Sequence, residues 1–312
     1  MTRPTPARSA PAETQPATHA ADRLLDAIDR CGSPVCVGLD PVLEKLPKHV
    51  LKQHPRDAHP IRIIGGYCVV VLDAIKEIVP CVKIQSACFE RYHERGYETL
   101  WFIISLAKDL GFEVILDAKR GDIGVSAEHY AASAAGHVDQ KFGVCSADWI
   151  TINSYLGEDG IMPFLVAGDR GAFALVRTSN AGGDAIQNLQ LKDGRTVAQA
   201  VASLIADIGA DHTGGRGFSS LGAVVGATKA AEAAKLRDLM PQQIFLVPGY
   251  GAQGGTIDDI KPCFHSNGTG AIVTASRSVI YAFDPDSPTW AESVRKAAKR
   301  LADEVGRAVG MR

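Results

Sequence analysis

Acidic and basic side chains alternate in the segment Asp117-Ala118-Lys119-Arg120-Gly121-Asp122-Ile123-Gly124, which follows the apolar run 112–116. In an extended strand, residues two apart share a face, so Asp117 and Lys119 point the same way. Gly121 can turn the chain, and Asp122 can then return toward the same space. Two acids around one lysine at the end of a buried strand must form ion pairs or take part in binding or catalysis, because unpaired buried charge costs free energy. Taken alone, a D-x-K motif is more often a structural salt-bridge cluster on a solvated loop.

Other charged or polar residues stand at the ends of further apolar runs. Asp40 ends the first run, and Lys83 lies in the second. Charged residues inside strands are rare unless they are paired, so we expect Asp40, Lys83, Asp117 and Lys119 to form one network of alternating sign. Three later runs lead into polar turns, at 177–180, 248–255 and 275–278.

Eight short apolar runs alternate with amphipathic segments from residue 34 onward. The expected strands are Pro34–Leu39, Cys81–Ile84, Glu113–Leu116, Trp149–Ile152, Ala172–Val176, Ala223–Val225, Ile244–Val247 and Ala271–Thr274. The expected helices between and after them are Gly66–Val79, Tyr97–Asp109, Ser126–Lys141, Thr196–Ile208, Ala230–Leu239 and Ala291–Val309. Runs that are apolar on both faces and joined by crossover helices indicate a parallel sheet, and eight such units predict a single α/β domain, a (β/α)8 TIM barrel.

A phosphate site is expected where the seventh and eighth strands end. In barrels of this kind, the loops after these two strands often hold phosphate. Here they are a glycine-rich turn that contains Gln253 and a turn that ends in Arg277. Glycines let backbone N–H groups approach an anion, and an arginine adds a permanent charge with two donors. A glycine-rich turn on its own could also be a plain connection.

The composition excludes several classes of protein. The chain has 312 residues, 46% of them hydrophobic and 22% charged, with a formal net charge of −2. This near-neutral balance gives no reason to expect nucleic acid or an anionic membrane as a partner. No run approaches the ~18 apolar residues of a membrane span. Seven scattered cysteines without a C-x-x-C pair are typical of reduced thiols in the cytoplasm.

The first twenty residues differ from the rest of the chain. Residues 1–20 are rich in Ala, Thr and Pro and have almost no large apolar side chains. Such a segment cannot bury enough surface to offset its ordering entropy, and it lacks the apolar core of a secretory signal. We expect a disordered tail over residues 1–20 and the barrel over residues 21–312.

Taken together, these motifs resemble the orotidine 5′-phosphate decarboxylase family, and in particular its longer bacterial branch, over roughly residues 22–305. The segments that carry the resemblance are Val37–Asp40, Val82–Gln85, Asp117–Gly124, Arg177–Asn180, Val225–Thr228, Pro248–Gly255 and Ser276-Arg277. The resemblance implies decarboxylation of orotidine 5′-monophosphate to uridine 5′-monophosphate, the last step of pyrimidine synthesis, without a metal or an organic cofactor. Ser276 stands where shorter family members have a glycine before the arginine.

The resemblance also implies a role for each candidate residue. Lys119 would donate the proton to C6 of the pyrimidine ring, with Asp117 beside the departing carboxylate. Lys83 would tie the charge network to the ribose, and Asp40 would accept from a ribose hydroxyl. Ser179 would hydrogen-bond to the amide edge of the pyrimidine, and Gln253 and Arg277 would hold the phosphate. Asp122 would complete the site of the other subunit in a homodimer.

Two other interpretations remain for the same residues. One is another phosphate-binding barrel lyase, such as a hexulose-phosphate synthase, which shares the D-x-K-x-x-D arrangement but requires a divalent metal. The other is a catalytically inactive barrel that only binds nucleotides or a partner. The second interpretation predicts a broken charge network, whereas all of its members are present in this chain.

Overall fold

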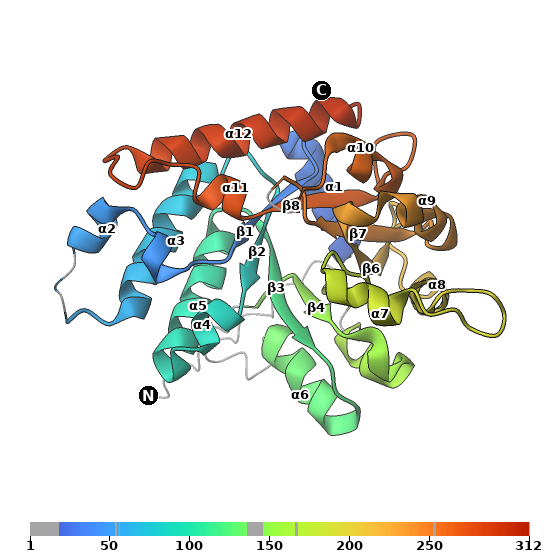
Figure 1. Ribbon diagram of the computed structural model, residues 1–312. Coiled ribbons are helices and arrows are strands. Elements are labelled where there is room, and N and C mark those ends of the chain that lie inside the picture. The colour runs from blue at the N-terminus through green and yellow to red at the C-terminus, as the bar shows by residue number, and fades with distance from the viewer. Residues whose placement is uncertain are drawn as a thin grey trace, which may run out of the picture.

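The computed structural model describes residues 19–53, 55, 57–135, 146–165, 168–251 and 254–311. Eight strands form one closed barrel in chain order, and every neighbouring pair is parallel, including β1 with β8. Figure 1 shows the strands at the centre with helices arranged around them. The strands are β1 (Val35–Leu39), β2 (Cys81–Gln85), β3 (Glu113–Arg120), β4 (Trp149–Ile152), β5 (Gly171–Arg177), β6 (Ser219–Val225), β7 (Gln243–Pro248) and β8 (Ala271–Ala275).

The long helices that cover the outside of the barrel are α3 (Pro60–Ile75), α5 (His93–Asp109), α6 (Gly124–Ala135), α8 (Val197–Ala210), α9 (Ala230–Leu239) and α12 (Trp290–Ala308). A further helix, α1 (Ala20–Cys31), precedes the first strand. Short helices occupy the connections: α2 (Lys48–Lys52), α4 (Ala87–Glu90), α7 (Asp184–Gln187), α10 (Ile257–Ile260) and α11 (Arg277–Ile280). No helix within the described residues is long and apolar enough to cross a membrane.

The apolar residues divide into two clusters because successive side chains of a strand point to opposite faces. Val35, Val37 and Leu39 of β1 pack outward in the cluster shared with the surrounding helices. Cys36 of the same strand points into the barrel, in a cluster that also holds inward-facing residues of β2–β8 and the apolar face of α1. The barrel interior is therefore a packed core over which α1 lies at one end, and the opposite, carboxyl-terminal end of the strands is where a site is expected.

The predicted TIM barrel is confirmed, with all eight expected strands present. β6 begins at Ser219, four residues before the expected start, and β3 continues through the charged motif as far as Arg120. The helix expected over Gly66–Val79 runs instead over Pro60–Ile75, because His59 caps its first turn and Pro60 occupies its first position, where a proline is tolerated. Part of the helix expected over Ser126–Lys141 lies outside the described residues.

Helix α1 was not among the expected elements, and it changes where the barrel begins. It starts at Ala20, which is completely buried, and the ring of His19 accepts a hydrogen bond from the Ala21 N–H at 3.3 Å. Nε2 of His19 also lies 3.1 Å from the carbonyl oxygen of His212. His19 and Ala20, which we assigned to the tail, therefore belong to α1 and its cap, while residues 1–18 lie outside the described part of the chain.

Candidate active site

The candidate site is built on strand positions that face into the barrel. Residues 81, 83 and 85 of β2 alternate with outward-facing residues, so Lys83 and Gln85 stand above Cys81 of the interior core. The same alternation places Asp117 above Ile115 on β3 and Thr151 above Trp149 on β4. These inward positions continue beyond the apolar layers and reach the carboxyl-terminal mouth of the barrel.

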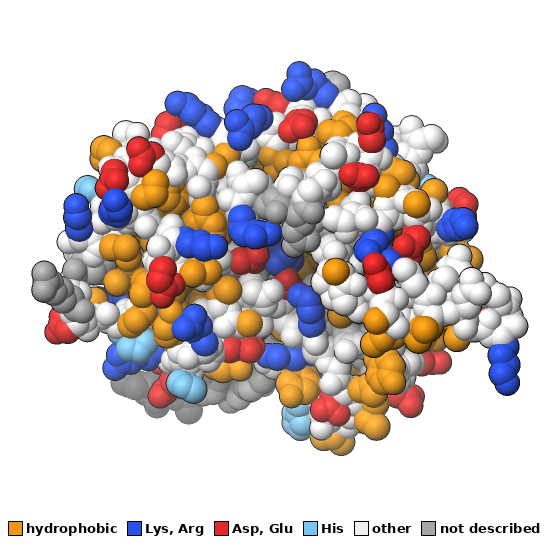
Figure 2. Space-filling model, viewed as in Figure 1, with side chains coloured by type: hydrophobic (Ala, Val, Ile, Leu, Met, Phe, Trp, Pro, Cys, Tyr) orange, Lys and Arg blue, Asp and Glu red, His pale blue; other side chains and the backbone are white. Residues whose placement is uncertain are grey.

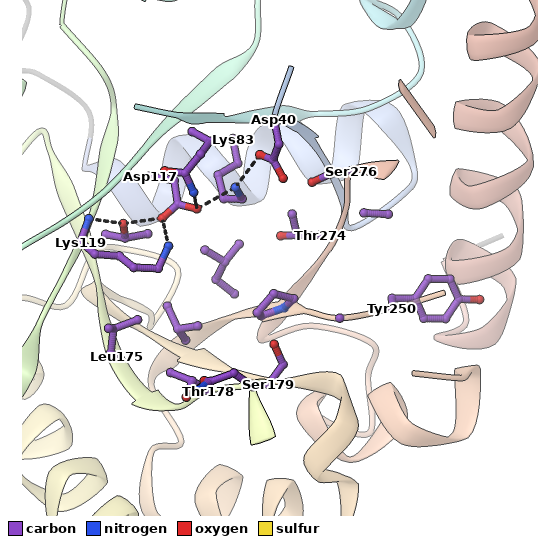
Figure 3. Close-up of a pocket in the computed structure, with 18 of the residues that line it drawn as sticks. Asp40, Lys83, Asp117, Lys119, Leu175, Thr178, Ser179, Tyr250, Thr274 and Ser276 are labelled. Atoms are coloured by element: carbon purple, nitrogen blue, oxygen red, sulfur yellow. Dashed lines mark hydrogen bonds and ion pairs between the residues drawn. The ribbon is translucent and has the colours of Figure 1, made fainter. Parts of the chain in front are cut away.

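The predicted charge network is present, and Figure 3 shows its members lying side by side on one wall of a cavity. Nζ of Lys83 lies 2.7 Å from Oδ2 of Asp117 and 3.3 Å from Oδ1 of Asp40. Nζ of Lys119 lies 2.5 Å from Oδ1 of Asp117. The order of charges is thus acid, base, acid, base, from Asp40 to Lys119. Such alternation lowers the cost of burying Lys83 and Asp117, which are 7% and 5% exposed.

Asp117 is the most heavily bonded member of this network. Besides both lysines, its carboxylate accepts hydrogen bonds from Nε2 of Gln85 at 3.1 Å and from Oγ1 of Thr151 at 2.8 Å. Burial opposes ionisation of this carboxyl, but Lys83 and Lys119 prevail and hold its pKa well below its usual range. For Lys83, burial favours the neutral form, but the carboxylates of Asp40 and Asp117 prevail and raise its pKa above the usual value. Asp117 is therefore an anion and Lys83 a cation at neutral pH.

Lys119 has an unusual backbone conformation. Its φ angle is +46°, in the left-handed region that a side chain with a Cβ rarely adopts. The pairing of β3 with β4 shifts register between Leu116 and Arg120, so the strand bulges at this residue. The backbone N–H of Lys119 donates to Oγ1 of Thr151 at 2.9 Å. The bulge places the Lys119 side chain, which is 48% exposed, at the cavity with its ammonium against Asp117.

The opposite wall of the cavity comes from the loop after β5. Thr178, Ser179 and Asn180 line a cavity of about 420 Å³ together with the charge network. Figure 3 shows Thr178 and Ser179 on the side away from Asp40 and Lys83. Leu175, Val224 and Leu246 also line the cavity, so one part of it is apolar. The cavity thus offers a charged wall, a polar wall and an apolar portion, which suits a ligand with a planar ring and polar substituents.

The loop that carries Ser179 is held by a buried arginine. The Arg177 guanidinium donates to Oε2 of Glu232 at 2.6 Å and to Oδ1 of Asp184 at 2.6 Å, and Asp184 also contacts Nζ of Lys229 at 2.7 Å. On the other side, Gly226 makes room for the loop, because a Cβ there would lie 2.8 Å from the backbone of Ser179. The side chain of Ser179 is therefore presented from a braced segment.

The third part of the cavity is formed by the turns after β7 and β8. Pro248, Gly249 and Tyr250 line it from the first turn, and Ser276 and Arg277 line it from the second. Arg277 is the first residue of α11. In Figure 2, basic and acidic side chains meet near the centre of the face that contains the barrel mouth. Gln253, the other predicted phosphate residue, lies outside the described residues.

Asp122 does not join the network of its own chain. It is absent from the lining of the cavity, and its Oδ1 accepts a hydrogen bond from the Ile123 N–H at 2.9 Å. Gly121 therefore does not return Asp122 to the cavity that holds Lys119 of the same subunit. β3 runs on through Lys119 to Arg120, so the chain leaves the barrel mouth before it turns, and the acid lies beyond the rim.

Sequence reasoning missed three residues of the site. Gln85 stands two positions after Lys83 on the same face of β2, so its place could have been read from strand alternation. Thr151 occupies the equivalent inward position of β4. Gly38 is needed for close packing, since a Cβ there would overlap Oγ of Ser276 and lie 3.1 Å from its Cβ. Among the residues that the structure describes, no three His, Cys, Asp or Glu side chains gather in a way that could hold a metal ion.

Comparison with known proteins agrees with this geometry. Residues 33–289 match the model of the orotidine 5′-phosphate decarboxylase / HUMPS family. The chain belongs to this family. The matched segment includes all eight strands and every residue of the charge network.

Relatives in this family match the chain over most of its length. It is 39% identical over 298 residues to the orotidine 5′-phosphate decarboxylase of Rhodopirellula baltica, covering 91% of this chain and 98% of that protein. It is 34% identical over 294 residues to the enzyme of the same name from Clostridium perfringens, with 93% and 99% of the two chains covered. In the solved structure of Leishmania donovani OMP decarboxylase, the protein is 30% identical to this chain, with a TM-score of 0.75 and coverage of 94% of this chain and 99% of that one.

Membership of this family and the near full-length similarity define the activity. The chain is an orotidine 5′-phosphate decarboxylase, a lyase of UMP synthesis built on a TIM barrel.

Proposed function

We propose that Lys119 is the proton donor of this decarboxylase and that Asp117 lies beside the departing carboxylate. In this mechanism the bond between C6 and the carboxyl carbon breaks, CO₂ leaves, and the electron pair stays on C6. The ammonium of Lys119 then gives its proton to C6. Loss of CO₂ from a ring carbon leaves no good electron sink, so a fixed cation nearby is an effective way to stabilise the developing charge.

The observation that carries this proposal is the chain of alternating charges from Asp40 to Lys119 on one wall of the cavity. It holds Lys119 close to a carboxylate that stays ionised, and Asp117 would repel the substrate carboxylate but not the neutral CO₂. Asp40, 35% exposed and bonded to Lys83, is placed to accept a hydrogen bond from a ribose hydroxyl. Lys83, which forms ion pairs with both carboxylates, would connect the ribose-binding part of the site to Asp117.

The substrate is orotidine 5′-monophosphate, and we assign its two ends to opposite parts of the cavity. Ser179, on the braced loop after β5, would read the amide edge of the pyrimidine. Arg277, at the start of α11, would hold the phosphate with Gln253. Binding energy from the phosphate, which lies far from C6, can then be used to organise the reacting end of the site.

We also propose that two copies of the chain form a homodimer in which Asp122 completes the partner's site. Asp122 lies outside its own cavity and is followed by Ile123 and Val125, which are 54% and 66% exposed. Tyr155 and Leu156, in the turn after β4, are 86% and 46% exposed. Figure 2 shows apolar side chains along the lower edge of the view, where Figure 1 places α6. Burial of such a face against a second copy would bring Asp122 toward another subunit.

A cytoplasmic location is part of the same proposal. Five cysteines within the described residues are free thiols, as expected of a reducing compartment: Cys36, Cys68, Cys81, Cys88 and Cys263. Cell fractionation followed by immunodetection would check it, and enrichment in a secreted or membrane fraction would contradict it.

One assay tests the proposed chemistry. Purified protein is mixed with orotidine 5′-monophosphate, and the ultraviolet absorbance of the ring is followed with and without a chelator. We expect turnover that the chelator leaves unchanged, and a loss of at least about three powers of ten in Lys119→Ala, since each ~1.4 kcal/mol of lost stabilisation is tenfold in rate. Activity that requires a divalent metal would favour a hexulose-phosphate synthase type of site instead. Near-normal turnover of a folded Lys119→Ala variant would show that another group donates the proton.

A further inference from the structure

One tyrosine connects the two ends of the cavity without lining it. Tyr281 follows α11 directly, and its backbone N–H donates to the carbonyl of Arg277 at 3.3 Å. Its phenol hydroxyl accepts a hydrogen bond from the Val42 N–H at 2.8 Å and donates to the carbonyl oxygen of Asp40 at 3.0 Å. A single side chain therefore holds the loop after β1 on both sides of Pro41. Tyr281 itself is not among the residues that line the cavity.

The tyrosine ring is itself held in place. It stacks on Tyr67 with the ring centroids 6.5 Å apart and the planes at 12°, and Phe283 contacts it edge-on at 6.4 Å. Tyr67 in turn hydrogen-bonds to the carbonyl of Ile280, the last residue of α11. Burial raises the pKa of Tyr281 to about 12, so the hydroxyl keeps its proton at neutral pH and can go on donating to Asp40. The aromatic cluster thus connects α11 rigidly to the loop that carries Asp40.

We propose that Tyr281 is a positioning residue that couples the phosphate end of the site to the charge network through Asp40. The inference rests on the proposed roles of Arg277 and Asp40. The path has three links. Arg277 and Tyr281 lie one helical turn apart, at the start of α11 and directly after its end. The Tyr281 hydroxyl donates to the backbone carbonyl of Asp40, and the Asp40 carboxylate forms an ion pair with Lys83. A phosphate that draws α11 toward the cavity would carry Tyr281 with it and set the position of Asp40 against Lys83.

The test compares Tyr281→Phe with wild type on two substrates, orotidine 5′-monophosphate and its phosphate-free nucleoside, orotidine. Phenylalanine keeps the stacked ring and removes only the hydroxyl. We expect kcat/KM for the nucleotide to fall on the order of tenfold, because small misplacements of a binding group are costly, and kcat/KM for the nucleoside to fall less than about twofold. Equal losses on both substrates would reduce Tyr281 to a structural role and overturn the coupling.

A double-mutant cycle with Asp40→Ala tests the path. If Tyr281 acts through Asp40, then Tyr281→Phe should change kcat/KM less than about twofold in the Asp40→Ala background. A full tenfold loss in that background would overturn the inference. Tyr97→Phe is the matched control, because it removes a phenol hydroxyl from an exposed tyrosine of α5 that is not part of this aromatic cluster. We expect any effect of Tyr97→Phe to be the same with and without Asp40.

The outcome separates this inference from the proposed function. A wild-type protein that fails to consume orotidine 5′-monophosphate contradicts the decarboxylase mechanism itself. An active wild type whose kcat/KM is unchanged by Tyr281→Phe contradicts only the coupling. Melting temperatures of all variants show whether a loss of activity comes from unfolding.

Discussion

The hydroxyl of Thr151 accepts the backbone N–H of Lys119 at 2.9 Å and, through its own hydrogen, bonds to the carboxylate of Asp117 at 2.8 Å. One side chain of β4 thus stabilises both the left-handed backbone of the proposed proton donor and the anion beside it. A left-handed conformation at a residue other than glycine costs free energy, of order 1–3 kcal/mol, and persists only where neighbouring groups hold it. Thr151 is the neighbour placed to do so.

Thr151→Val should therefore lower activity without removing the fold. Valine keeps the shape of the side chain but leaves the Lys119 N–H without its acceptor and removes one of the two hydrogen bonds to Oδ1 of Asp117. We expect kcat to fall about ten- to hundredfold, with a smaller change in KM, because the lesion lies at the reacting end of the site. Thr151→Ser, which keeps the hydroxyl, should recover most of the activity. If the valine variant turns over like wild type, Lys119 does not depend on this contact.

The close approach of Gly38 to Ser276 gives a second prediction. A Cβ at position 38 would overlap Oγ of Ser276 and lie 3.1 Å from its Cβ, so Gly38→Ala must displace Ser276, the residue next to Arg277. We expect Gly38→Ala to lower kcat/KM by about tenfold or more. The double variant Gly38→Ala with Ser276→Gly removes the overlapping hydroxyl and should regain most of that loss. Failure of the second change to restore activity, in a folded protein, would mean that the overlap is not the cause.

Strand ends were the most predictable part of this molecule. Buried parallel strands are apolar on both faces, so their positions and their order could be predicted from short apolar runs. The predicted strand ends then placed four charged residues at one end of the barrel: Asp40, Lys83, Asp117 and Lys119. This pairing was predictable because charges at strand ends must be neutralised by one another when they are buried.

Hydroxyl groups were far less predictable. Thr151 and Tyr281 matter through hydrogen bonds to backbone groups of β3 and of the β1 loop, and no spacing in the sequence signals such a bond. The left-handed backbone of Lys119 follows from a register shift between two strands, which depends on their pairing in the folded barrel. Helix α1, in contrast, could have been predicted, because Leu24 and Ile28 are four residues apart on its buried face.

The start of α1 defines a pair of truncations. Deletion of residues 1–18 should leave the melting temperature and kcat/KM unchanged, because that composition supplies little apolar surface to pack. Deletion of residues 1–20 also removes the His19 cap and the buried Ala20, so we expect the melting temperature to fall by about 2–5 °C. Differential scanning fluorimetry of the two proteins checks this. Identical melting curves would show that the first turn of α1 contributes nothing.

Glu113 predicts an unusual dependence of stability on pH. It lies at the start of β3, with Nε of Arg23 3.2 Å from Oε1, while Oε2 is buried and has no hydrogen-bond partner within the described residues. Burial and the neighbouring carboxylate of Asp148 raise the pKa of Glu113 to about 7, although Arg23 and Lys108 oppose the shift. In the unfolded chain the pKa is about 4.3, so between these values the native state binds a proton that the unfolded state does not. The contribution of this residue to stability is therefore complete below about pH 4 and is lost as pH rises through 7.

Glu113→Gln should remove this pH dependence, because the amide stays neutral at every pH. We expect the variant to exceed wild type in melting temperature by about 1–3 °C at pH 8 and to match it near pH 5. Glu77→Gln, at an exposed position, serves as the control for the loss of a carboxylate. A Glu113→Gln shift that stays constant from pH 5 to pH 8 would rule out protonation of Glu113 in the native state.

The position of Asp122 beyond the rim of its own barrel leads to the last prediction. Because Asp122 does not line the cavity that holds Lys119, a homodimer with shared sites would take its Lys119 and its Asp122 from different subunits. Homodimers of Lys119→Ala and of Asp122→Ala should both be nearly inactive. Mixing the two by dissociation and reassociation yields heterodimers in which one site has both residues intact and the other has neither. With complete mixing about half of the dimers are heterodimers, so activity should approach about one quarter of wild type.

A light-scattering mass and a tagged pull-down would confirm that heterodimers form. If they form and activity stays at the level of the parent variants, Asp122 does not act across an interface.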